Sequence, residues 1–147
     1  MSDTPPESLD GSPPKGATAS VVNPKITSLE LQVRFGDTDA LGHVNNAVYA
    51  SYAELGRIHY IAQLGLPATG FILARLAMDF RRQVKLGERC WITTEMARVG
   101  NTSMIMWQVM YAEGEVACEY EAVVVWFDYE TNRPVPIPPE QRALITG

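Results

Sequence analysis

A short stretch around residue 30 alternates apolar and polar side chains with the period of a strand. The polar positions are Glu30, Gln32 and Arg34, as expected for a strand that buries one face. The pattern predicts the first strand of the fold over residues 29–35. Its apolar positions are Leu29, Leu31, Val33 and Phe35.

A loop and a long helix are predicted next. The run GDTDALGHVNN is rich in glycine, aspartate and asparagine, which is typical of a tight loop. The following proline-free stretch predicts a helix from about Ala47 to Leu64, capped by Asn45 or Asn46 and ended by a glycine and a proline. Because apolar side chains cover most of its circumference, we expect this helix to be largely buried. They are Val48, Tyr49, Tyr52, Leu55, Ile58, Tyr60, Ile61 and Leu64.

Four segments after the helix have the character of strands. One alternates apolar and polar positions and the others are rich in β-forming residues. The joints between them are short and contain glycine, which predicts antiparallel hairpins. The chain is therefore predicted to have an α+β fold, a curved antiparallel sheet of about five strands wrapped around one long central helix. The segments are residues 74–84, 90–99, 103–111 and 116–127.

Two of these strand segments, 104–111 and 123–127, are apolar on both faces. A sheet in a single small subunit has one face in water, so a second apolar face indicates a covering subunit. We expect a homo-oligomer. The proline-rich tail cannot continue a central strand, and a short helix is predicted from Pro138.

Composition limits the class of protein. The 147 residues carry a net charge of −5, which suits a single domain and argues against a face that binds duplex nucleic acid. Residues 1–25 hold few bulky apolar side chains, so we expect a disordered leader before a domain over residues 26–147. We find neither a membrane span nor a secretory signal, and we expect a cytoplasmic protein without a membrane partner.

Metal and serine chemistry are disfavoured. Cys90 and Cys118 lie far apart in the sequence, and His43 and His59 are separated by most of the helix, so no recognised set of metal ligands is present. His59, inside the helix, is expected to be a packed or surface residue. The serines lack the G-x-S-x-G turn of a serine hydrolase.

The loop before the helix is the best candidate for chemistry. On spacing alone, Asp37 and Asp39 are turn formers and Asn45 is a helix cap. The unpaired amides at the start of the helix, near Asn46, can also polarise an acyl carbonyl while Asp39 activates water or attacks directly. His43 fits a role at the acyl carbonyl and a structural role equally well.

The run FGDTDALGHVNNAVYASYAELGR closely resembles the signature of the 4-hydroxybenzoyl-CoA thioesterase family, within the hotdog-fold acyl-CoA thioesterases. It looks most like the bacterial long-chain acyl-CoA thioesterase branch, and the likeness extends more loosely over residues 26–138. The matching positions are Asp39, Gly42, His43, Val44, Asn45 and Tyr49.

The resemblance implies a hotdog fold and hydrolysis of an acyl-CoA. It gives Asp39 the role of nucleophile or general base and leaves Asp37 to shape the loop. It also implies a dimer whose sheets join edge to edge with the active site at the interface, often paired into a tetramer. No metal or bound cofactor is implied, because coenzyme A is part of the substrate.

Further substrate contacts are expected in this loop and in the segments that follow it. Asn45 and Tyr49 are candidates near the acyl group. A basic cluster around the first hairpin is a candidate for the coenzyme A phosphates, although any single member is better explained as a solvated charge. Two alternatives stay open: an acyl group carried on acyl carrier protein, and a non-catalytic hotdog module that binds acyl groups. The basic cluster is Arg81, Arg82, Lys85 and Arg89.

Overall fold

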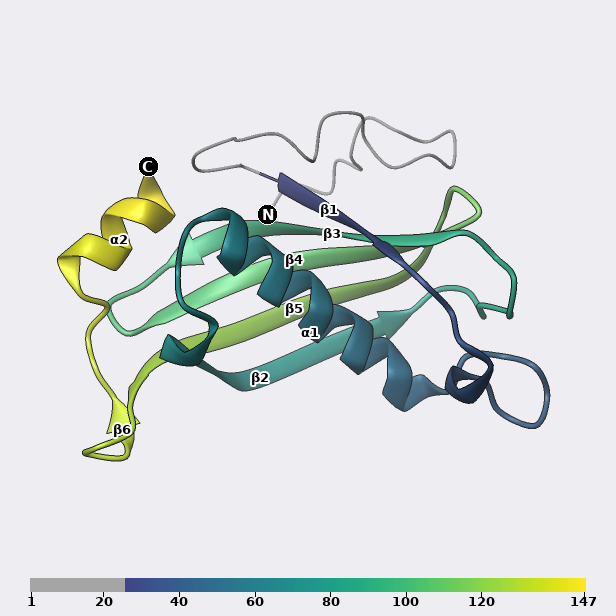
Figure 1. The fold of residues 1–147 in the computed structure, drawn as a ribbon, viewed down its shortest axis with the longest axis horizontal. Helices are drawn as coiled ribbons and strands as arrows, with labels where there is room; N and C mark the ends of the chain where they lie inside the picture. Colours follow the sequence, from purple (N-terminus) through teal and green to yellow (C-terminus); the bar gives the residue numbers. More distant parts are fainter. Residues whose placement is uncertain (1–25) are drawn as a thin grey trace.

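The computed structural model describes residues 26–147, and the predicted leader, residues 1–25, lies outside this range. The described chain forms one antiparallel sheet with a long helix across one face (Figure 1). The helices are α1 (Asn46–Gln63) and α2 (Pro139–Thr146), with short 3-10 turns η1 (Phe35–Asp37) and η2 (Ala68–Gly70). The strands are β1 (Ile26–Leu31), β2 (Phe71–Phe80), β3 (Cys90–Val99), β4 (Ser103–Ala112), β5 (Glu115–Asp128) and β6 (Arg133–Pro134).

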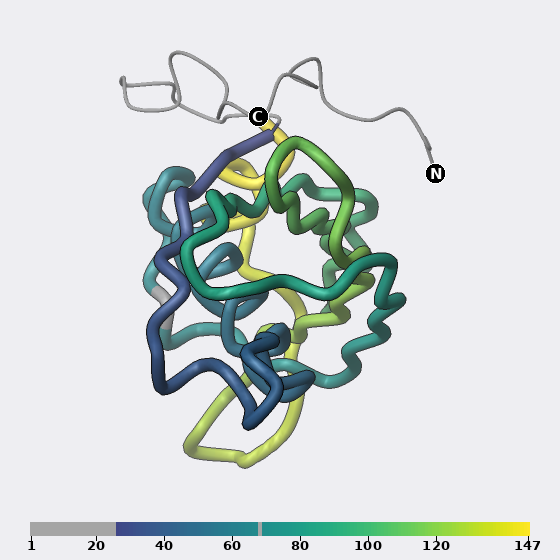
Figure 2. Tube along the Cα trace, turned by 90° about the vertical axis from the view of Figure 1, so that its right-hand side faces the viewer, coloured from purple at the N-terminus to yellow at the C-terminus, as the bar shows by residue number. Residues whose placement is uncertain are grey.

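The strand order is β1-β3-β4-β5-β2, and β6 adds a short pairing to the end of β5. Every paired strand is antiparallel to its neighbour. β1 and β2 are therefore the two edges, and the three hairpin strands lie between them. Seen along the long axis, the strands curve partly around α1 (Figure 2). This arrangement confirms the predicted α+β class and the curved sheet around one long helix.

The first strand differs from its predicted position. β1 ends at Leu31, and the chain turns into η1 at Phe35, whose side chain is 82% exposed. The turn forms because the carboxylate of Asp37 accepts a hydrogen bond from the Arg34 amide, 3.0 Å away, and draws the backbone out of the strand. The alternation of apolar and polar residues in the sequence continues to Phe35, whereas the pairing of β1 with β3 ends at Leu31.

Helix α1 begins and ends close to its predicted limits, with Asn45 as its N-cap. The expectation that it is buried on most sides is wrong for the described chain. The sheet covers one face only, so Leu55 is 50% and Ile58 43% exposed. The predicted C-terminal helix is present as α2, with Pro138 at its N-cap position.

The interior is divided between the two ends of α1. One apolar cluster surrounds Tyr49, Tyr52 and the paired strand ends, and a second surrounds Tyr60, Ile61 and the C-terminal tail. On the face of the sheet turned away from α1, Trp91 stacks on Tyr111 with ring centroids 5.4 Å apart. That contact accounts for part of the apolar character seen on both faces of the strand segments.

Both cysteines are free and fully buried within the first cluster. Burial raises the pKa of the Cys90 thiol to about 12 and that of the Cys118 thiol to about 11. A thiol in these surroundings stays protonated and behaves as a small apolar side chain.

Candidate active site

The loop before α1 is closed by backbone hydrogen bonds. Thr38 and Val44 form an isolated antiparallel bridge, and the Asp39 amide donates to the His43 carbonyl at 2.7 Å. The Gly42 amide donates back to the Asp39 carbonyl at 3.1 Å. Gly42 has a φ of +81°, a conformation that side chains disfavour. The sequence therefore folds residues 38–44 into a compact turn that carries Asp39 on its surface.

Asp39 is exposed, and its carboxylate is oriented by its own loop. One oxygen, Oδ1, accepts hydrogen bonds from the amides of Leu41 at 2.9 Å and His43 at 3.1 Å. Its other oxygen makes no hydrogen bond to any of residues 26–147. The carboxylate is thus held in place on one side and open on the other.

Asp37 is in a different situation and is buried. It accepts hydrogen bonds from the Arg34 guanidinium at 3.0 Å and from the Tyr52 hydroxyl at 2.7 Å. Burial acts to raise the pKa of Asp37, but the hydrogen bonds from Arg34 and Tyr52 outweigh it, so this pKa lies below its ordinary value. Asp37 ties η1 to α1 and is not free to react.

The start of α1 lies at the same end of the molecule as this loop (Figure 1). The Asn45 side chain accepts from the Ala47 amide at 2.9 Å, and the Asn45 carbonyl accepts from the Val48 amide at 2.9 Å. Within the described chain, the Asn46 amide has no acceptor. It is therefore the donor at the positive end of the helix dipole that remains available.

A second segment of chain supports the loop. The Val44 amide donates to the Val84 carbonyl at 2.7 Å, and His43 forms a backbone bridge with Lys85. This contact brings Lys85 to the predicted catalytic residues. No hydrogen bond of the His43 side chain forms with residues 26–147.

Tyr49 is buried, and its side chain is already engaged by the protein. Its hydroxyl donates to the Arg82 carbonyl at 3.3 Å, and its ring contacts Phe80 edge-on with centroids 5.1 Å apart. Burial raises the pKa of Tyr49. Within one subunit, Tyr49 therefore packs in the interior next to the loop, and its hydroxyl is not free to bind a substrate.

Two of the four predicted basic residues have carboxylate partners. Arg81 pairs with Glu119 at 2.9 Å, and Arg82 pairs with Glu88 at 2.6 Å and with Glu115 at 2.8 Å. Among the described residues, Lys85 and Arg89 have no ion pair within 4.0 Å. These two are the better placed of the four to meet an anion.

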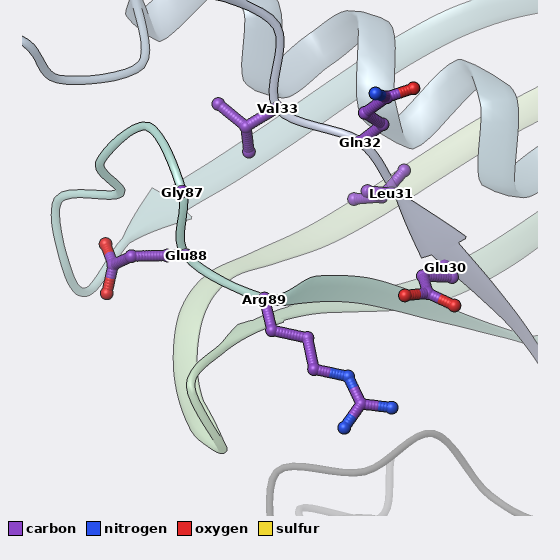
Figure 3. Close-up of a pocket in the computed structure, with 7 residues that line it drawn as sticks. All are labelled: Glu30, Leu31, Gln32, Val33, Gly87, Glu88 and Arg89. Atoms are coloured by element: carbon purple, nitrogen blue, oxygen red, sulfur yellow. The ribbon is translucent and has the colours of Figure 1, made fainter.

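A surface groove of about 390 Å³ lies between the end of β1 and the turn before β3. Figure 3 shows its lining side chains, among which Arg89 is accompanied by Glu30 and Glu88. None of the predicted catalytic residues lines it. We therefore do not identify this groove with the acyl site.

Side chains that could bind a metal are scattered over the described chain. No group of three or more histidine, cysteine, aspartate or glutamate side chains lies close enough together in residues 26–147 to hold an ion. His59 is half-buried on α1, and its Nε2 atom finds no hydrogen-bond partner there.

No helix of the described chain is long and apolar enough to cross a bilayer.

The sequence reasoning missed two polar residues in the sheet. Gln108 and Tyr120 are both buried beneath α1 and hydrogen-bond its backbone. Gln108 carried a signal, because it is the one amide side chain in the otherwise apolar β4 run SMIMWQVMYA. Tyr120 carried none, since a tyrosine suits any buried strand.

Comparison with known proteins places this geometry in a family. The chain is 26% identical over 125 residues to the acyl-CoA thioester hydrolase YbgC of Escherichia coli O157:H7, covering 80% of this chain and 93% of that protein. It is 26% identical over 124 residues to the chloroplastic acyl-acyl carrier protein thioesterase ATL3 of Arabidopsis thaliana, covering 78% of this chain and 65% of that protein. The chain thus spans less than two thirds of that plant relative.

A solved structure shows the same likeness in three dimensions. A thioesterase from Thermus thermophilus, complexed with coenzyme A and Zn, superposes with a TM-score of 0.75 at 36% identity. The match covers 80% of this chain and 90% of that one. The family model of the thioesterase-like superfamily matches residues 33–145. This range contains the loop, α1 and the sheet from β2 onward, and the chain belongs to the thioesterase-like superfamily, with the hotdog fold that its sequence indicated.

Proposed function

We propose that this protein hydrolyses an acyl-CoA to a free acid and coenzyme A, with Asp39 as general base or nucleophile. The observation that carries the assignment is the pairing of two groups at one end of the molecule. Asp39 presents an exposed carboxylate fixed by two loop amides, and α1 begins there with the unpaired amide of Asn46. The first group can attack or activate water, and the second can stabilise the negative oxygen that forms.

The class of reaction follows from the family: the protein is a thioester hydrolase. Water or the Asp39 carboxylate adds to the carbonyl carbon, and the carbon–sulfur bond then breaks. Coenzyme A leaves as a thiolate that takes up a proton. Because a thiol has a pKa of about 8.5, it leaves without a strong general acid. If Asp39 is the nucleophile, water then hydrolyses the resulting anhydride and releases the acid.

Coenzyme A is the proposed carrier of the acyl group. The Thermus thermophilus relative is a coenzyme A complex, and in this chain Lys85 is bridged to the catalytic loop without an ion-pair partner within the described residues. A lysine in this place suits a ligand rich in phosphate. Arg89 and, less directly, the paired Arg81 and Arg82 complete the proposed basic surface. Acyl carrier protein is the alternative carrier, and the ATL3 relative is named for it.

The proposed enzyme is a homo-oligomer, either a dimer or a dimer of dimers. The described chain leaves apolar side chains exposed on α1, at Leu55 and Ile58, and on the edge strand β2, at Leu73 and Phe80. A second copy joined along β2 would cover both sets and satisfy the open edge of the sheet. Such an interface would adjoin the loop that carries Asp39. Because coenzyme A thioesters are made and used inside cells, the proposed location is the cytoplasm.

The test compares thiol release from a panel of acyl-CoAs by the parent protein, Asp39→Asn and Asp128→Asn. Asparagine keeps the side-chain oxygen that accepts from the loop amides but removes the charge, so Asp39→Asn should lose turnover by about a hundredfold or more. Asp128 accepts a hydrogen bond from the Glu130 amide at 2.9 Å in a similar turn, near β6. Asp128→Asn should therefore match the parent.

Equal turnover by Asp39→Asn and the parent would exclude the proposed role of Asp39. No release from any acyl-CoA by the parent, with release from acyl-acyl carrier protein, would move the assignment to the alternative carrier. No release from either substrate would leave the acyl-binding module as the remaining function.

A further inference from the structure

Two adjacent side chains of the sheet hold the backbone of α1. Gln108 on β4 and Tyr120 on β5 are direct cross-strand partners, and both are fully buried on the face toward the helix. The Gln108 Nε2 amide donates to the Ala53 carbonyl at 2.9 Å. The Tyr120 hydroxyl donates to the Tyr49 carbonyl at 2.9 Å. The two carbonyls are four residues apart, so the pair binds successive turns on one side of α1.

These two hydrogen bonds add direction to a contact that is otherwise mostly apolar. The hydrophobic effect is non-directional and depends mainly on the apolar area buried, whereas a hydrogen bond weakens steeply when its angle changes. The helix approaches the sheet closely here, because a Cβ atom on Gly56 would lie 2.8 Å from the Gln108 Nε2. The sheet therefore fixes both the rotation and the axial position of α1.

The hydroxyl of Tyr120 is not needed to satisfy the helix. In a regular helix the Tyr49 carbonyl already accepts from the amide four residues later. Burial of a hydroxyl is costly unless it is bonded, and phenylalanine would fill the same space without that cost. The hydroxyl thus serves the orientation of the first turn of α1, to which Tyr49 belongs.

We propose that Tyr120 is a positioning residue, which fixes the first turn of α1 through the Tyr49 carbonyl and so aims the Asn46 amide at the thioester oxygen. This role rests on the proposed function, in which that amide stabilises the oxyanion. Asn46 precedes Tyr49 by three residues, so both lie on the same turn. The Tyr49 hydroxyl, bonded to the Arg82 carbonyl, holds the turn from another side.

The experiment removes one hydroxyl at each end of the helix. Tyr120→Phe frees the first turn. Tyr60→Phe is the matched control, because Tyr60 is also a buried tyrosine, in the last turns of α1 and away from the catalytic loop. Both variants should lose a similar, small amount of thermal stability. Only Tyr120→Phe should lower kcat for an acyl-CoA, on the order of tenfold with KM unchanged, because misaimed donors impair the transition state more than binding.

Hydrogen exchange of the backbone amides, measured by NMR, tests the order of the first turn of α1 independently of catalytic activity. Tyr120→Phe should speed exchange at residues 48–53, and Tyr60→Phe should leave those amides as in the parent. An active parent whose kcat falls equally, or not at all, in the two variants would overturn the inference, as would unchanged exchange in Tyr120→Phe. A parent without activity would instead reject the proposed function, and the exchange data would still decide whether Tyr120 orders the first turn.

Discussion

At the scale of single residues, the partners of each charge decide which of them are free for a ligand. Arg82 is held by Glu88 and Glu115, and hydrogen bonding to Arg82 lowers the pKa of Glu88. Its guanidinium therefore braces the turn before β3. Lys85, three residues later, is bridged to His43 through its backbone only. The same cluster thus contains both structural and available cations.

Lys85→Met should raise KM for acyl-CoA several-fold with kcat unchanged. A lysine on the surface would attract the phosphates of the substrate equally in the ground state and in the transition state, and salt screens this attraction. The effect should shrink in high salt and be absent for an acyl-pantetheine, which lacks the nucleotide phosphates. Arg98→Met is the control, since Arg98 is exposed near the far end of β3, has no ion pair within 4.0 Å among residues 26–147 and is not in the cluster. An equal rise in KM for acyl-pantetheine would show that Lys85 acts by another route.

The sequence predicted the local chemistry of this region better than its long-range contacts. Asn45 is the cap, as its residue type and position indicated. Asp37 shapes the loop as expected, but its contact with Tyr52, 15 residues later, depends on how α1 folds back over β1. Tyr49 was expected near the acyl group, and only the fold shows that its hydroxyl already donates to the carbonyl of Arg82, just after β2.

At the scale of elements, the contact between α1 and β4 depends on a buried cation. Arg57 is 5% exposed, and its guanidinium donates to Gln108 Oε1 at 3.2 Å. Burial lowers the pKa of Arg57. Gln108 also donates to Ala53 and to Thr94, so one amide side chain joins a helix and two strands.

Gln108→Leu should destabilise the protein by roughly 3 kcal/mol, because it leaves a buried guanidinium without its acceptor. Adding Arg57→Met should recover part of that loss, since the double variant buries no unpaired charge. Urea unfolding followed by circular dichroism measures both. A double variant less stable than Gln108→Leu alone would show that Arg57 contributes chiefly by packing.

Periodicity located most elements but not all of their ends. Alternation in residues 29–35 is continuous, yet pairing stops at Leu31, because a buried carboxylate at Asp37 outweighs the propensity of the chain to stay extended. β2 likewise ends at Phe80, earlier than the pattern to residue 84 suggested. In both places the chain leaves the sheet to support the loop that carries Asp39.

At the scale of the whole molecule, one subunit leaves an apolar helix stripe and an open strand edge. We expect light scattering at low micromolar concentration to give a dimer or tetramer. Leu55→Glu with Ile58→Glu should shift it toward monomer, since buried like charges oppose association. Tyr129→Glu, on an exposed aromatic at the turn after β5, should leave the assembly unchanged. A stable monomeric parent would contradict an active site at a subunit interface.

Both thiols of the folded chain are buried and stay protonated at neutral pH, which shapes how the enzyme can be assayed. A disulfide reagent reacts with thiolate, so in the native protein it should report the coenzyme A set free in each turnover with little background. When the chain unfolds, the two cysteines become reactive, and the same reagent then measures the fraction of unfolded protein. One colour reaction can therefore follow turnover in the native enzyme and loss of structure in a denatured one.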